Sequence, residues 1–154
     1  MEFLSFTDSL ANEFSQMNLV WVKKYFEVEL TDELVLSHPQ KNIIDKGGYI
    51  FFAKTGDTIT GTFALLKVND HEFELSKMAV KEEFIGRNVG NAMLTFCLQK
   101  AKSLGIQKLV LYSNTKLGPA IHLYKKYGFV RVPLINSAYK RSDIKMELEL
   151  KQSR

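Results

Sequence analysis

The sequence predicts an α/β domain, with a mixed and mostly antiparallel sheet of about six or seven strands that is flanked by about four helices. Two patterns lead to this prediction. Residues 49–54, 58–68 and 72–80 are rich in aromatic and apolar side chains and are separated by turn signals such as Thr55-Gly56-Asp57, which indicates a meander of three antiparallel strands. The chain then alternates between apolar residues at helical spacing and short apolar runs, a pattern typical of helices that connect the strands of a mixed sheet.

The segment before the meander is predicted to be largely helical. Residues 2–6 suit a short first strand. Residues 8–26 carry large apolar side chains at three- and four-residue intervals, which is typical of an amphipathic helix. A second, short helix begins near Thr31 and ends at His38, because a proline follows and disfavours helical geometry at the residue before it.

The segment after the meander is predicted to continue with alternating helices and strands. In order, these are a helix over 89–104, a strand over 107–112, a helix over 117–127, a strand over 129–132 and a last strand over 143–150. Gly105 and Gly128 suit the left-handed position that follows many helix ends. We expect residues 137–142 to form a polar loop and residues 151–154 to form a frayed tail.

The composition favours one globular domain over residues 1–154. The 45% hydrophobic and 25% charged fractions are ordinary for such a protein, and no run approaches the ~20 apolar residues of a membrane span. The net charge of +4 is mild, and neither basic-aromatic interleaving nor zinc-finger spacing points to nucleic acid. A single cysteine, Cys97, cannot form an internal disulfide, and the N-terminus lacks a signal-peptide pattern, so we expect a cytoplasmic protein. The three histidines are scattered, so no metal site is expected.

Residues 85–90, Ile-Gly-Arg-Asn-Val-Gly, connect a predicted strand to a predicted helix. Free backbone N–H groups and the helix dipole at such a junction attract anions. Glycine and asparagine accept left-handed backbone geometry, which lets a ligand approach the main chain. The junction is therefore interpreted as a phosphate or pyrophosphate site. A glycine turn that serves packing alone is the alternative.

Two sequence signatures connect this junction to a known family. One is Leu75-Ser-Lys-Met-Ala-Val80 followed by Gly86-Arg-Asn-Val-Gly90, and the other is Ala120-Ile-His-Leu-Tyr-Lys-Lys-Tyr-Gly-Phe129. Together they resemble the GNAT superfamily of acetyl-CoA-dependent N-acetyltransferases. The resemblance implies a single N-acetyltransferase domain, with variable acceptor-side helices over residues 1–46 and an acetyl-CoA-binding core over residues 47–150.

The resemblance implies acetyl-CoA as the co-substrate and no metal. Main-chain groups of Met78, Ala79 and Val80 would bind the pantetheine arm, and one N–H group there would polarise the thioester carbonyl. Pyrophosphate would be held by main-chain N–H groups of Gly86, Arg87, Asn88, Val89, Gly90 and Asn91. The side chain of Arg87 would add positive charge toward the phosphates.

The turn departs from the family pattern at two positions. Ile85 stands where glutamine or arginine is usual, and Asn88 replaces a glycine, whereas Gly90 matches. A shifted register, Arg87-x-x-Gly90-x-Ala92, matches the letters but requires a longer loop, so the unshifted register is preferred. Asparagine is the best non-glycine residue for a left-handed position, so the loop geometry should survive.

The resemblance also implies two catalytic residues. Tyr124 would be the general acid that protonates the departing thiolate, and packing of its ring is the alternative. Glu74 would be the general base, with Glu72 as second choice, and solvent-facing strand carboxylates are the alternative. Asn114 resembles the asparagine that binds the pantetheine arm, although local turn formation by Ser-Asn-Thr is also consistent with its position.

The acceptor pocket is predicted to be lined by Trp21, Tyr25, Glu29 and Tyr139. In this prediction Glu29 pairs with an acceptor ammonium group and Arg141 with a carboxylate. The sequence does not identify the amine.

The implied function is acetyl transfer to a primary amine of a small molecule or peptide, by direct attack in a ternary complex. A non-catalytic module that binds or senses CoA is the alternative, and a basic interaction protein is a third hypothesis. Homodimers are common in the family, and no residue pattern here identifies an interface.

Overall fold

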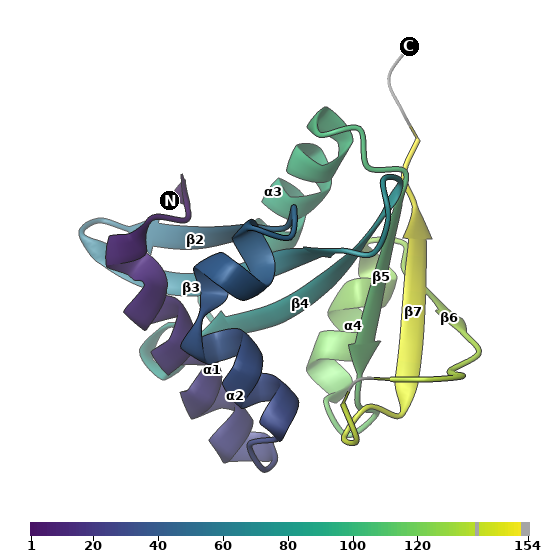
Figure 1. Cartoon of the computed structure of the whole chain (residues 1–154), viewed down its shortest axis with the longest axis horizontal. Coiled ribbons are helices and arrows are strands. Elements are labelled where there is room, and N and C mark those ends of the chain that lie inside the picture. Colours follow the sequence, from purple (N-terminus) through teal and green to yellow (C-terminus); the bar gives the residue numbers. More distant parts are fainter. Residues whose placement is uncertain (138, 152–154) are drawn as a thin grey trace.

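A computed structural model describes residues 1–137 and 139–151 of the protein. Residue 138 of the predicted polar loop and residues 152–154 of the predicted tail lie outside these ranges. Within them, seven strands form one sheet in the order β1-β2-β3-β4-β5-β7-β6 (Figure 1). The strands are β1 Glu2–Ser5, β2 Tyr49–Thr55, β3 Thr58–Lys67, β4 Glu72–Val80, β5 Lys108–Ser113, β6 Val130–Val132 and β7 Ile144–Glu149.

The sheet is mixed and mostly antiparallel. Only β4 and β5 pair in parallel, and the other five neighbouring pairs are antiparallel. The meander β2-β3-β4 occupies the second to fourth positions of the sheet, and β4 is its central strand. The predicted sheet and meander are therefore confirmed.

In the described ranges, four α-helices cover the two faces of the sheet. They are α1 Ala11–Tyr25, α2 Leu30–Ser37, α3 Val89–Ser103 and α4 Gly118–Lys126, and short 3-10 or π turns lie at Asp8–Leu10 (η1), Gln40–Ile44 (η2) and Glu82–Phe84 (η3). The helix predicted over 8–26 thus opens as a 3-10 turn and becomes α-helical at Ala11. Among the described residues, no helix has the length and apolar character that a membrane crossing requires.

Each face of the sheet has its own core. The core between the sheet and α3 includes Phe63, Met93 and Leu109, all fully buried, and the core under α1 and α2 includes Phe14 and Phe52. Successive side chains of a strand point to opposite faces. The apolar run in β2 therefore contributes to both cores, and this explains why it shows no polar alternation.

Strand β4 contains a β-bulge at Lys77, whose φ is +56°. Thr62 of β3 pairs with Ala79 and Ala64 pairs with Ser76, so two residues of β4 oppose one residue of β3. An extra residue in one strand reverses which face the later side chains occupy. Leu75 accordingly packs in the α3 core and Ala79 in the α1–α2 core.

Strands β4 and β5 separate just before the bulge. They pair only from Glu72 to Glu74 of β4, opposite Lys108 to Val110 of β5, and then diverge (Figure 1). The second half of β4 therefore has β3 on one side and no strand on the other, and this gap positions the candidate site.

Candidate active site

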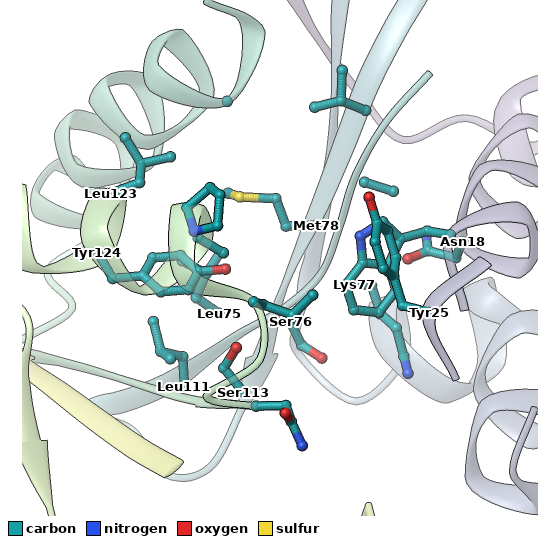
Figure 2. Close-up of a pocket in the computed structure, with 18 of the residues that line it drawn as sticks. Asn18, Tyr25, Leu75, Ser76, Lys77, Met78, Leu111, Ser113, Leu123 and Tyr124 are labelled. Carbon is teal, nitrogen blue, oxygen red and sulfur yellow. The ribbon is translucent and has the colours of Figure 1, made fainter. Parts of the chain in front are cut away.

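A cavity of about 590 Å³ opens between the separated strands. It is lined by the second half of β4, the end of β5, the start of α3, one side of α4, the aromatic side of α1, and Tyr139, Arg141 and Ser142. Figure 2 shows Tyr124, Leu123 and Leu111 on one side of it and Asn18, Tyr25 and Lys77 on the other, with Ser76 and Met78 between them.

Most of the residues predicted for the site lie at this cavity. Its lining includes Glu74, Met78, Ala79, Val80, Gly86, Asn88, Val89, Gly90, Asn91, Asn114 and Tyr124, and on the acceptor side Trp21, Tyr25, Tyr139 and Arg141. Arg87, Glu72 and Glu29 do not line it. Arg87 is exposed, with its guanidinium carbon 5.4 Å from the ring centroid of Phe84.

The main chain from Leu75 to Val80 forms one wall of the cavity. Because β5 no longer pairs with it, the backbone groups of β4 that point away from β3 have no partner strand. Backbone N–H and C=O groups in such a position need another hydrogen-bonding partner. An extended ligand with amide groups would complete the sheet there, as in β-strand addition.

The N-terminus of α3 forms a second wall. Asn88 has a left-handed backbone with φ +67°, as predicted for this position, and its side chain does not cap the helix. Its Oδ1 instead accepts a hydrogen bond of 3.0 Å from Asn91 Nδ2. The first backbone bond of α3 is the one from Ala92 N–H to Asn88 C=O, so the N–H groups of residues 89–91 precede the intrahelical ladder and suit an anion.

Tyr124 presents its hydroxyl to the cavity from α4 (Figure 2). Its ring packs edge-on against Phe129, with 5.9 Å between the centroids. Burial, assisted by the nearby Cys97, raises the pKa of Tyr124 to about 12. The phenol is therefore protonated at neutral pH and can donate a proton.

Glu74 lies at the last pair before β4 and β5 separate, opposite Val110. It is partly buried and lines the cavity. Desolvation raises the pKa of Glu74, and a hydrogen bond with Ser76 and the charge of Lys77 oppose the rise in part. A carboxylate with a raised pKa holds a proton more readily, which suits a general base that works near neutral pH.

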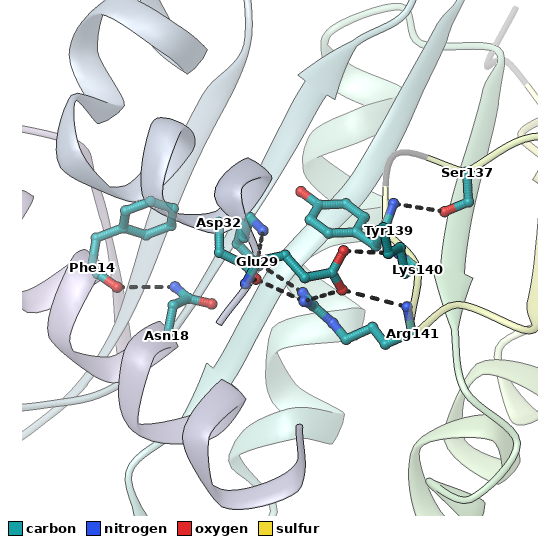
Figure 3. A network of polar contacts seen from close by, with 9 residues as sticks. Phe14, Asn18, Glu29, Asp32, Ser137, Tyr139, Lys140 and Arg141 are labelled. Atoms are coloured by element: carbon teal, nitrogen blue, oxygen red, sulfur yellow. Dashed lines mark hydrogen bonds and ion pairs between the residues drawn. The ribbon is translucent and has the colours of Figure 1, made fainter. Parts of the chain in front are cut away.

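A buried ionic network closes the acceptor side (Figure 3). Asp32 is fully buried, and its Oδ1 accepts hydrogen bonds from Lys77 Nζ at 3.0 Å and Arg141 Nη2 at 2.9 Å. Its Oδ2 accepts from Arg141 Nη1 at 2.7 Å and from the backbone N–H of Glu29 at 2.9 Å. Burial alone would raise the pKa of Asp32, but the bonds from Arg141 and Glu29 and the charge of Lys77 lower it to about 2.

Glu29 and Arg141 bind each other as part of this network. Arg141 Nη1 lies 3.2 Å from Glu29 Oε2, and Glu29 Oε1 accepts a hydrogen bond of 2.8 Å from the backbone N–H of Lys140. The carboxylate that was expected to pair with a substrate ammonium therefore fixes the loop before β7 to the start of α2. Asn114 also contacts this loop, because its Nδ2 donates a 2.6 Å hydrogen bond to Arg141 C=O.

Sequence analysis missed Asp32 and Lys77, which hold the network together. Lys77 did carry a signal, since it is a charged residue at a strand position where the alternation of β4 predicts a buried side chain. Among the described residues, no cluster of three or more His, Cys, Asp or Glu side chains could hold a metal ion.

The cavity, the open edge of β4 and the uncapped α3 N-terminus can be compared with known proteins. Residues 14–129 match the family model described as the acetyltransferase (GNAT) family. The chain belongs to this family. The resemblance read from the two sequence signatures is therefore confirmed, together with the assignment to the N-acetyltransferases.

Similarity to individual GNAT proteins agrees with this membership. An uncharacterized N-acetyltransferase of Bacillus subtilis, YvbK, is 32% identical over 104 residues, which cover 66% of this chain and 67% of YvbK. An acetyltransferase of the GNAT family from Staphylococcus aureus shares the fold with a TM-score of 0.85 at 20% identity, covering 97% of this chain and 99% of that one. An aminoglycoside 6'-N-acetyltransferase complexed with coenzyme A shares the fold with a TM-score of 0.72 at 13% identity, covering 100% of this chain and 99% of that one.

Proposed function

We propose that this GNAT protein transfers an acetyl group from acetyl-CoA to a primary amine of a small molecule or peptide, by direct attack in a ternary complex. One observation supports this most strongly. The unpaired edge of β4, the N-terminus of α3 and the Tyr124 hydroxyl all border one cavity. A thioester with a long amide-containing arm and a pyrophosphate has groups that match each of these three features.

In this proposal, residues 47–150 bind acetyl-CoA and residues 1–46 contribute to the acceptor side. Main-chain groups of Met78, Ala79 and Val80 bind the pantetheine arm, and one N–H group steadies the oxyanion that forms at the thioester carbon. The N–H groups of the segment from Gly86 to Asn91 hold the pyrophosphate, and Arg87 adds positive charge from outside the cavity lining. Asn114 binds the arm, with its side chain already anchored to the loop before β7.

The two catalytic roles fall to Glu74 and Tyr124. Glu74 accepts a proton from the acceptor ammonium, directly or through water, and the free amine attacks the thioester carbonyl. When the tetrahedral intermediate collapses, Tyr124 donates its proton to the departing thiolate. The raised pKa of Glu74 makes this carboxylate a stronger base. The raised pKa of Tyr124 keeps the phenol protonated until the thiolate departs.

Direct attack is preferred over an acyl-enzyme because of the position of Cys97. This thiol is fully buried on α3, and burial raises its pKa to about 12. A thiolate nucleophile needs a lowered pKa and access to the substrate. Cys97 meets neither requirement.

Thermal unfolding with and without acetyl-CoA, followed by a thiol-release assay with amines, tests the proposal. At a ligand concentration of about 100 times the Kd, one-site binding should add about 2.7 kcal/mol of stability. Binding without amine-dependent thiol release would favour the alternative of a CoA-sensing module. A cytoplasmic location is a further prediction from the sequence, and a homodimer is a further expectation from the family resemblance.

A further inference from the structure

The acceptor side of the cavity is built from aromatic rings. Trp21, Tyr25 and Phe26 line it from α1 and the residue that follows. The ring centroid of Trp21 lies 5.6 Å from that of Tyr25 and 5.8 Å from that of Phe26, so the three form one cluster. Tyr139 lines the cavity from the loop before β7. Such walls favour a flat apolar ligand body, because burial and ring contacts both contribute to its binding.

Three of these four rings, those of Tyr25, Phe26 and Tyr139, already carry cations of the protein. The Nζ atom of Lys24 lies 5.2 Å from the ring centroid of Tyr25, and that of Lys116 lies 4.0 Å from the centroid of Phe26. The Nζ atom of Lys77 lies 4.2 Å from the centroid of Tyr139. The guanidinium carbon of Arg141 lies 4.6 Å from the Tyr139 centroid. A ring surface with a resident cation attracts a second one poorly, because the two like charges repel each other. Tyr25, Phe26 and Tyr139 are therefore poor sites for an additional ammonium group.

The carboxylates of the acceptor side are also occupied, with one exception. Both oxygens of Asp32 and both oxygens of Glu29 accept hydrogen bonds from the protein, and neither residue lines the cavity. Among the described residues that line the cavity, Glu74 is the sole carboxylate. The cavity thus provides a negative charge for one ammonium group and none for a second.

We infer that the acceptor is a small monoamine with a flat apolar body, such as an arylalkylamine, and not a polycation. This inference rests on the proposed function. A second ammonium group in this cavity loses hydration without gaining a carboxylate partner, which is unfavourable. An aromatic body loses little hydration free energy and contacts the Trp21 cluster.

Four amines assayed with the wild-type protein and saturating acetyl-CoA test the inference. The panel is phenethylamine and tryptamine, each with one ammonium and an aromatic body, against spermidine and kanamycin, which are polycations. We expect kcat/KM to be about tenfold or more higher for the two arylalkylamines. Equal or faster thiol release with spermidine or kanamycin would overturn the inference and leave the proposed function standing. If neither these four amines nor any other primary amine gives thiol release, the proposed function is contradicted as well.

A matched pair of variants on α1 locates the binding site of the aromatic body. Trp21→Ala removes the centre of the ring cluster and should raise the KM for phenethylamine by about tenfold, with the KM for acetyl-CoA unchanged. Val20→Ala, at a neighbouring position that is 54% exposed and outside the cavity lining, should change neither constant. An unchanged KM for phenethylamine in Trp21→Ala would contradict the assignment of this wall to the acceptor.

Discussion

Lys77 Nζ lies 3.0 Å from Asp32 Oδ1, and the two side chains are only 4% and 0% exposed. This ion pair joins the bulge of β4 to the first turn of α2, 45 residues earlier in the chain. Because Lys77 has the left-handed φ of +56°, the pair also anchors the bulge, which lies in the part of β4 that no longer pairs with β5. Lys77 thus belongs both to the open edge of β4 and to the ionic network beside the cavity.

Two substitutions at Lys77 separate the backbone contribution from the ion pair, because both remove the amine. Lys77→Gly accepts a positive φ, whereas Lys77→Val is β-branched and disfavours it. A left-handed residue costs about 1–2 kcal/mol, and the greater unfolded-state entropy of glycine offsets part of this. We expect the free energy of unfolding in urea to be about 1 kcal/mol lower for Lys77→Val than for Lys77→Gly. We also expect Lys77→Val to have the higher KM for acetyl-CoA. Equal stabilities and equal KM values would show that the left-handed backbone is not required.

Protonation of Asp32 at acidic pH should lower the free energy of unfolding of the protein. Its pKa in the folded protein is lowered from 3.8 to about 2, so its stabilising contribution is present above pH 3.8 and is lost as the pH falls toward 2. The shift corresponds to about 2 kcal/mol. Urea unfolding of the wild type and of Asp32→Asn at pH 6 and pH 2.5 measures this contribution. The free energies of unfolding of the two proteins should differ less at pH 2.5 than at pH 6.

The control for Asp32→Asn is Asp57→Asn, which changes an exposed carboxyl group in the turn between β2 and β3. Asp57→Asn should follow the wild type at both pH values. Asp32→Asn should in addition lose about 3–5 kcal/mol at pH 6, because Lys77 and Arg141 remain buried without their partner. A loss of the same size at both pH values would contradict the lowered pKa.

Tyr124→Phe should lower kcat by about 10²-fold while the KM for acetyl-CoA stays nearly constant, since the ring is kept and the proton donor is lost. Tyr127→Phe is the matched control. Tyr127 directly follows α4, bonds to Thr95 and Asn91 and does not line the cavity, so Tyr127→Phe should retain the wild-type kcat. Equal losses of kcat and of acetyl-CoA binding in Tyr124→Phe would mean that the tyrosine packs and is not an acid.

Glu74→Gln should lower kcat/KM by about 10²-fold at neutral pH and should approach the wild type at high pH. The reason is that the amine is increasingly deprotonated by solvent as the pH rises. The raised pKa of Glu74 places the acidic limb of the wild-type profile above the usual carboxyl range, and this limb should vanish in the variant. Glu72→Gln, on the same strand but outside the cavity and 3.8 Å from Lys108, should keep the wild-type profile. Loss of the acidic limb in Glu72→Gln, with a wild-type profile in Glu74→Gln, would make Glu72 the base.

The order of strands and helices was predictable because local periodicity determines it. The alternation in β4 and the three- and four-residue spacing in α3 predicted those elements almost to their observed ends, Glu72–Val80 and Val89–Ser103. The left-handed Asn88 was also predictable, since few residue types accept that conformation. The cavity residues of β4 and α3 followed from the family signatures.

The ionic network was not predictable, because it joins residues that are distant in the sequence. Nothing local indicates that Asp32, which also belongs to a capping box at the start of α2, reaches Lys77 and Arg141. Sequence reasoning therefore left Glu29 and Arg141 free for substrate, whereas they bind each other. The bulge at Lys77 was missed for the same reason, because strand pairing, not composition, reveals an extra residue.

The most direct test of the central claim is a reaction of the wild-type protein with acetyl-CoA and phenethylamine or another primary amine, followed by thiol detection and mass spectrometry of the amine. We predict thiol release that requires protein, acetyl-CoA and amine together, with one acetyl group gained by the amine for each thiol released. Acetyl-CoA that stabilises the protein against heat but gives no acetylated amine would contradict the claim that this GNAT chain catalyses the transfer.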